Sequence, residues 1–167
     1  TPRVYEVTPN PLEGLTPPQY TQVLYEEDFK REKQWEESSG AGGNVTYGSG
    51  TLALALSGNN AEIISLSKIR LPDTFYIEMT LESAICGEDD SFGILFWRFS
   101  ELGTYRMLYR CGGQARLERA IFDGVSVLQN WTPLRRYQPN APALNRLGIW
   151  ADKGTLGSEV GEIIANA

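Results

Sequence analysis

The chain has 167 residues, of which 41% are apolar and 11% aromatic, a composition typical of one globular domain and not of a disordered tail. Its formal net charge of −6 argues against nucleic-acid binding, because an acidic surface repels phosphates. It contains no histidine, which excludes the usual general base, histidine-activated nucleophiles and most zinc sites.

The first twenty residues differ from the rest in composition. Residues 1–20 contain five prolines and few apolar residues, which predicts an extended leader or linker. It is either a functional segment, as a tether to an upstream anchor or a docking arm on a partner, or an unstructured terminus. The chain opens without a signal-peptide core, as a processed secreted chain would, and no apolar stretch reaches the ~20 residues of a membrane span. We expect the folded domain at residues 21–167.

Short strands separated by turn residues are predicted through the first half of the chain. Residues 22–29 are expected to form the first strand, followed by a charged connection that carries Trp35. Residues 44–47 and 51–56 are predicted to pair as a hairpin, because glycines lie between them and leucine alternates with small residues in the second arm. Residues 61–66 are expected to form another strand.

The clearest alternation runs from Phe75 to Phe122. Turn residues divide it at intervals of about ten residues, which indicates an antiparallel sandwich or barrel. The run 91–99 is apolar on both faces and is predicted to be a central strand. No segment shows convincing helical periodicity, and residues 157–165 come nearest to it. The strands predicted from Phe75 onward are 74–82, 91–99, 104–110, 114–122, 125–128 and 145–150.

The two cysteines, Cys86 and Cys111, each follow a predicted strand. They can pair across the end of a sheet if the topology brings their Cα atoms within ~7 Å. The alternative is that they are two unrelated small core residues. The sequence does not decide between a disulfide and two separate core cysteines.

An ordered series of segments resembles a known family. The series begins with Tyr25-Glu-Glu-Asp-Phe29 and Trp35 and continues through Phe75-Tyr-Ile-Glu-Met79, Asp89-Asp-Ser-Phe-Gly-Ile-Leu-Phe96, Thr104-Tyr-Arg-Met-Leu108, Gly113-Gln-Ala-Arg-Leu-Glu-Arg119, Asp123-Gly124, Asn130-Trp-Thr132 and Asn145-Arg-Leu147. In this order, over roughly residues 23–155, it resembles the concanavalin A-like lectin and glucanase (laminin-G-like jelly-roll) domains of bacterial surface and secreted proteins. The resemblance implies an all-β, concanavalin A-like jelly-roll β-sandwich of two antiparallel sheets.

The chain departs from that family after residue 150. The family's domains continue with a hairpin and a closing strand, whereas the segment 154–164 of this chain is shorter than those elements require. We therefore expect the sandwich to lack its usual C-terminal strands. A longer parent protein, a partner strand or residues 1–20 could fill the gap, and we favour the first.

The glucanases of this family carry Glu-x-Asp-x-x-Glu on one strand. Here Glu78 and Glu82 share a face, but Thr80 stands between them, and residues four apart on a strand are ~13 Å apart. A retaining glycosidase needs two carboxyl groups about 5 Å apart. The sequence therefore predicts a protein that is not an enzyme.

The acidic loop that includes Asp89 and Asp90 contains the hard oxygen ligands that calcium prefers. Asp28 is a second candidate ligand, implied by the resemblance alone. The spaced ligands of a dedicated calcium loop are missing, so a solvated turn is the favoured interpretation. We expect no cofactor, with a structural calcium ion as the one candidate.

Strand parity predicts one set of polar side chains on the exposed concave face of the sheet. Sugars bind where aromatic rings stack on them and where Arg and acidic side chains meet their hydroxyls. The alternative is ordinary cross-strand pairing and core packing. The predicted ligand-binding residues are Arg98, Tyr105 or Arg106, Arg116 and Glu118.

These features together predict a non-catalytic extracytoplasmic module, secreted or on the cell surface, that binds glycan or a cell-surface polymer. The first alternative is a structural or accessory subunit of a surface assembly, which would bind protein. A glycoside hydrolase ranks third.

Overall fold

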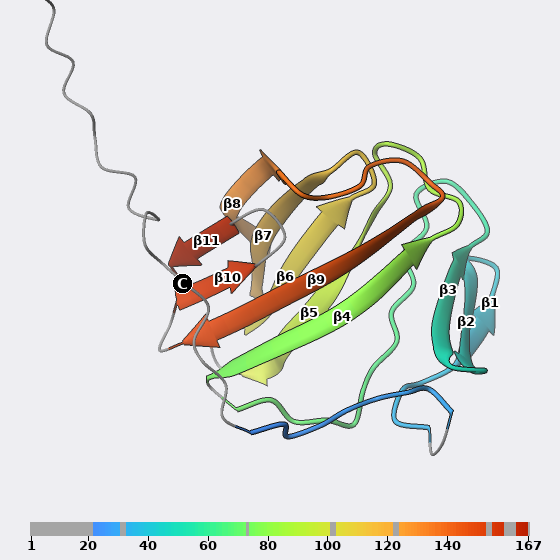
Figure 1. Ribbon diagram of the computed structural model, residues 1–167, viewed down its shortest axis with the longest axis horizontal. Coiled ribbons are helices and arrows are strands. Elements are labelled where there is room, and N and C mark those ends of the chain that lie inside the picture. The colour runs from blue at the N-terminus through green and yellow to red at the C-terminus, as the bar shows by residue number, and fades with distance from the viewer. Residues whose placement is uncertain are drawn as a thin grey trace, which may run out of the picture. The chain divides into compact units, whose positions relative to one another are not determined.

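The computed structural model describes residues 22–30, 33–72, 74–100, 103–121, 124–152, 155–158 and 163–166. These residues form strands and no helix, and each strand pairing between them is antiparallel (Figure 1). The all-β prediction is thus confirmed. Nothing in the described ranges is a helix long and apolar enough to cross a membrane. The predicted leader at 1–20 lies outside the described residues.

The segment Thr21–Arg70 is a compact unit with its own sheet. That sheet has the order β1-β2-β3, and the β2–β3 hairpin confirms the predicted pairing. Val45 and Tyr47 of β2 are buried on one face, while Leu54 and Leu56 of the edge strand β3 are half exposed. The strands are β1 (Ser38–Gly40), β2 (Gly43–Gly48) and β3 (Thr51–Leu56).

Glu27 holds the chain before this sheet in place. Its carboxylate accepts hydrogen bonds from the Tyr47 hydroxyl at 2.8 Å, from the Phe29 amide at 2.8 Å and from the Tyr25 hydroxyl. Phe29 also packs edge-to-face on Tyr47, with ring centroids 5.6 Å apart. Residues 22–29 therefore form no strand, contrary to the prediction, because side-chain bonds to β2 replace a backbone ladder.

Residues 71–167 belong to a second compact unit, which contains two four-stranded sheets. One sheet has the order β11-β10-β9-β4, in which β9 pairs along the whole of β4 (Figure 1). The other has the order β5-β6-β7-β8. The strands are β4 (Phe75–Ser83), β5 (Ser91–Ser100), β6 (Gly103–Arg110), β7 (Gln114–Ile121), β8 (Gly124–Pro133), β9 (Ala143–Asp152), β10 (Thr155–Ser158) and β11 (Ile163–Asn166).

Both sheets contribute side chains to one hydrophobic cluster. Successive residues of a strand point to opposite faces, so every second residue can face the cluster. Phe75 of β4 meets Phe96 of β5 edge-to-face at 5.8 Å between centroids, and Phe96 stacks on Tyr105 of β6 at 5.9 Å. The fully buried members include Met107, Tyr109, Ala115, Leu117, Leu147, Ile149 and Ala151.

Three loops meet at one end of this unit. Cys86 and Cys111 are joined by a disulfide with Cα atoms 6.1 Å apart. Backbone hydrogen bonds link the same loops, from Gly112 N to Glu88 O at 2.9 Å and from Asn140 N to Cys111 O at 3.0 Å. Gly113 has a φ of +89°, which the tight turn between β6 and β7 requires and which glycine adopts without steric cost.

Four more expectations differ from the structure. Residues 61–66 are not a strand, and within the described part of the chain β5 pairs only with β6, so it is an edge strand and not a central one. The strand predicted at 125–128 is longer, extending to Pro133. After β9 the chain forms β10 and β11, where the sequence pattern indicated no strand.

Removing the disulfide should destabilise the protein. A Cys86→Ala/Cys111→Ala double variant is expected to lose about 3 kcal/mol of unfolding free energy, since the crosslink restricts the unfolded chain. Urea unfolding at equilibrium measures this loss. The wild-type protein in a reducing agent is the control and should unfold at the variant's midpoint. Unchanged unfolding on reduction would contradict the prediction.

The Glu27 network predicts a pH-dependent contribution to stability. Burial raises the pKa of Glu27, but the three hydrogen bonds outweigh this effect, and the pKa lies below its ordinary value of 4.5. A carboxyl group with a lowered pKa stabilises the fold above its unfolded pKa, and this stabilisation is lost as pH falls through its folded pKa.

Glu27→Gln should therefore reduce the unfolding free energy by about 1–2 kcal/mol at neutral pH. The difference from wild type should shrink as pH falls below 4.5, the ordinary pKa of the group. Thermal unfolding of both proteins across this pH range measures the gap. Glu26→Gln is the matched control, and a gap that is constant with pH would contradict the prediction.

Candidate functional site

The structure brings together three of the predicted ligand-binding residues. In the β6–β7 register Arg106 lies opposite Glu118, on the face of the sheet turned away from the core. An Nη2 of Arg106 lies 2.7 Å from one oxygen of Glu118, and Nε of Arg116 lies 2.7 Å from the other. The predicted clustering of these side chains on adjacent strands is therefore present.

Tyr105 does not belong to this set. It is only 2% exposed and lies within the core cluster, because odd-numbered residues of β6 face inward. The prediction of Tyr105 as an exposed ligand residue is therefore corrected in favour of its neighbour Arg106. Arg98 belongs to β5, but its side chain lies outside the described part of the structure.

The Glu118 carboxylate is covered by its two partners. Its side chain is 7% exposed, and each of its oxygens faces a guanidinium. Removing a charge from water is costly unless such partners compensate for it. Glu118 therefore positions the two arginines and is not presented to a ligand.

Two further residues, Arg110 and Trp131, extend this cluster. The guanidinium carbon of Arg110 lies 4.1 Å from the centroid of the Trp131 ring, and that of Arg116 lies 5.7 Å from it. Arg110 could have been identified from the sequence, because strand alternation places it on the same face as Arg106. Trp131 was missed, because the sequence placed it in a connection and not in the extended β8.

The acidic candidates for calcium all interact with protein groups. Asp89 lies 3.4 Å from the Arg110 guanidinium, and Asp90 accepts a 2.7 Å hydrogen bond from the Gly87 amide. In the Thr21–Arg70 unit Asp28 accepts one from the Lys30 amide at 3.0 Å. Within the described ranges no group of three potential ligands forms a metal site. The calcium ion stays a prediction.

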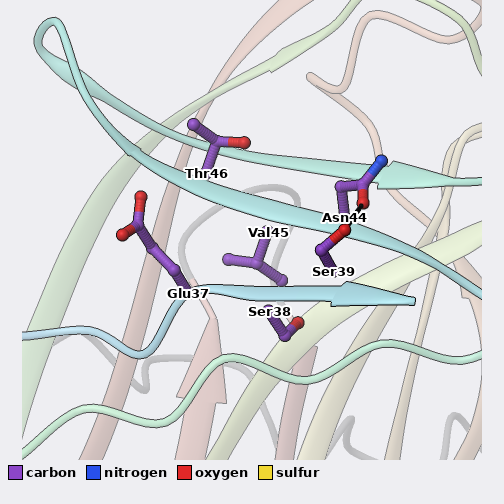
Figure 2. Close-up of a pocket in the computed structure, with 6 residues that line it drawn as sticks. All are labelled: Glu37, Ser38, Ser39, Asn44, Val45 and Thr46. Atoms are coloured by element: carbon purple, nitrogen blue, oxygen red, sulfur yellow. Dashed lines mark hydrogen bonds between the residues drawn. The ribbon is translucent and has the colours of Figure 1, made fainter.

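Two hollows, of about 410 and 450 Å³, lie on the surface of the described residues, and each is large enough for a small ligand. Figure 2 shows the first, where Ser39 donates a 2.8 Å hydrogen bond to Asn44. Val45 and Ser38 pair on the opposite face of the β1–β2 ladder from Ser39 and Asn44. This hollow wraps around a short edge strand, so its polar groups do not converge.

The second hollow lies on β4 and β9, and its polar groups do converge. Gly148 is opposite Glu78 in the register, so no side chain fills the surface beside this carboxylate. One oxygen of Glu78 lies 2.7 Å from Nη2 of Arg146, and the other accepts a 3.3 Å hydrogen bond from the Tyr76 hydroxyl. The lining residues are Tyr76, Glu78, Arg136, Gln138, Leu144, Asn145, Arg146 and Gly148.

A buried asparagine holds the loop that contributes Arg136 and Gln138 to this hollow. The Asn145 side chain accepts a hydrogen bond from the Gln138 amide at 2.8 Å and donates one to the Gln138 carbonyl at 3.1 Å. The loop is also bonded to the β6–β7 turn, from Leu134 N to Gly113 O at 2.9 Å. Both ends of the loop are thus fixed, which positions its side chains at the rim.

The sequence singled out Glu78 only to reject it, with Glu82, as a catalytic pair. It missed the other lining residues, because they gather only when β9 pairs with β4 across more than sixty residues of chain. No protein-family model, curated protein or solved structure matches this chain. The geometry alone therefore carries the functional argument.

Asn145→Ala should loosen the loop of this hollow. Loss of both hydrogen bonds of the buried Asn145 side chain is expected to lower the unfolding free energy by about 1–3 kcal/mol. Urea unfolding measures the loss, and amide hydrogen exchange should rise over residues 135–140. Gln138→Ala is the control, because it retains its backbone bonds to Asn145. Equal stability of the two variants would contradict this account.

Proposed function

We propose that this chain is a non-catalytic, extracytoplasmic module that binds glycan, built as a concanavalin A-like sandwich of its two four-stranded sheets. The hollow on β4 and β9 carries the proposal. It is a concave surface on a rigid strand pair, with a few polar groups in fixed positions, which is the usual construction of a small-molecule site.

The lining of this hollow fits the chemistry of a sugar. The Tyr76 ring offers an apolar surface for a pyranose face, while carboxylate, guanidinium and amide groups can hydrogen-bond its hydroxyls. Glu78 is oriented from both sides by Arg146 and Tyr76. Such preorganisation lowers the entropy cost of binding.

The same hollow supports binding over hydrolysis. Glu78 is the one acidic residue among the described lining residues, and glycoside hydrolysis needs two carboxyl groups. Glu82, four residues along the strand, is not part of the lining.

The disulfide supports placement outside the cytoplasm. Bonds such as Cys86–Cys111 form and persist in oxidising compartments and are rare in the reducing cytosol. This agrees with a secreted or cell-surface module.

A role as a structural subunit of a surface assembly is the second candidate. It is supported by β3, an uncharged edge strand of the Thr21–Arg70 unit with half-exposed Leu54 and Leu56. Exposed apolar edges of this kind pair readily with strands of other proteins.

Binding to immobilised cellohexaose, xylohexaose, laminarihexaose, mannohexaose and chitohexaose tests the glycan proposal. At least one of these should bind, and Glu78→Gln or Tyr76→Ala should weaken its binding about tenfold, through loss of a charge-assisted hydrogen bond or a stacking surface. Glu82→Gln is the matched control on the same strand face and should bind as wild type.

Two outcomes would overturn the glycan proposal. Absence of binding to all five sugars, with a stable protein complex on native purification, would favour the assembly subunit. Release of reducing sugar that disappears in Glu78→Gln or Glu82→Gln would make the protein an enzyme.

A further inference from the structure

We infer that the outer face of β6, β7 and β8 is a second site, which binds the carboxylates of a uronic-acid polysaccharide. We call Arg106, Arg110, Arg116 and Trp131 the arginine–tryptophan face. The choice of a polysaccharide rests on the proposed function, whereas the preference for carboxylate rests on this face alone.

The face has an excess of positive charge in a chain whose net charge is −6. Three guanidinium groups meet two carboxylates, since the covered Glu118 pairs with both Arg106 and Arg116 and the exposed Asp89 pairs with Arg110. Arginine stays charged at any physiological pH, so the excess is permanent. Local charge excess, and not net charge, decides what a surface attracts at short range, because salt screens interactions beyond ~10 Å.

Arg110 is the group least satisfied by the protein. Its ion partner, Asp89, lies 3.4 Å away and is 89% exposed, so water weakens the attraction. Its other contacts are the Trp131 ring and a long, 3.4 Å hydrogen bond to Gln114. A ligand carboxylate that approaches in the plane of the guanidinium would gain two charge-assisted hydrogen bonds in place of this pair.

The guanidinium groups are also held in position before a ligand arrives. Their side chains are 22%, 30% and 25% exposed for Arg106, Arg110 and Arg116, so each lies against the sheet with part of its surface open. Glu118 fixes two of them and the indole of Trp131 fixes the third. Fixed arginines lose less entropy on binding than free ones.

A polysaccharide fits this face better than an acidic peptide. Peptides recognised by sheets add a strand to an open edge and place side chains in pockets. Arg106, Arg110 and Arg116 lie on β6 and β7, which are the interior strands of this sheet, and they line neither of the two hollows. Arginines on neighbouring strands, ~4.8 Å apart, form an array suited to a polymer that repeats one carboxylate per sugar.

Isothermal titration of the full chain with decagalacturonate, and with its methyl ester, tests the inference. The acid should bind and the uncharged ester should bind at least about tenfold more weakly. Raising NaCl from about 50 to about 300 mM should weaken binding of the acid.

Three variants connect the binding to this face. Arg110→Gln should weaken decagalacturonate binding about tenfold. Asp89→Asn, which removes the competing carboxylate, should strengthen it about two- to threefold, a gain that a merely structural role would not give. Arg135→Gln is the control, because it removes the same charge from an exposed loop residue outside the face and should change affinity less than about twofold.

Equal binding of acid and ester, or unchanged binding by Arg110→Gln, would overturn the inference. If a decaglutamate peptide bound with the same affinity as decagalacturonate, the ligand would be an acidic protein and not a polysaccharide. This outcome is distinct from the test of the hollow, because Arg110 does not line the hollow. Failure of the neutral hexasaccharides to bind would refute the hollow alone.

Discussion

The edge-to-face contact of Phe75 with Phe96 joins the two sheets of the unit from Leu71 onward. Both rings lie on the inward parity of their strands, and the same parity places Tyr105 and Met107 in the core. Because side chains alternate with a period of two, a register slip of one residue would carry Arg106, Arg116 and Glu118 into the apolar cluster. The core therefore fixes which polar groups the outer faces present, and both proposed sites depend on it.

The second constraint is the linkage of loops at one end of this unit. The Cys86–Cys111 disulfide and the backbone bonds of Gly112 and Asn140 join three connections. One of these carries Asp89, which faces Arg110, and another carries Arg136 and Gln138 to the rim of the hollow. Both sets of side chains therefore lie on loops that are bonded to their neighbours, which holds their polar groups in fixed positions.

Charge is organised locally in this acidic protein. Arg146 is paired with Glu78 at the hollow, and Arg106 and Arg116 with Glu118 on the other sheet. The exposed Arg146–Glu78 pair gains little net energy, and the covered Glu118 offsets the cost of its own burial by pairing with two guanidinium groups. The role of these pairs is therefore to orient hydrogen-bond donors toward positions that a ligand hydroxyl or carboxylate could occupy.

The sequence by itself determined the features that depend on local alternation and turn chemistry. It predicted the all-β class, the β2–β3 hairpin and the strands from Phe75 to Ile121, and it placed Arg116 and Glu118 on one face with either Tyr105 or Arg106. Only the tertiary structure decided that β5 is an edge strand, that residues 22–29 are held by Glu27, that Trp131 reaches Arg110, and that Gly148 leaves a hollow beside Glu78. These features arise from pairings between distant segments, and alternation within one strand carries no information about which strand becomes its neighbour or in which register.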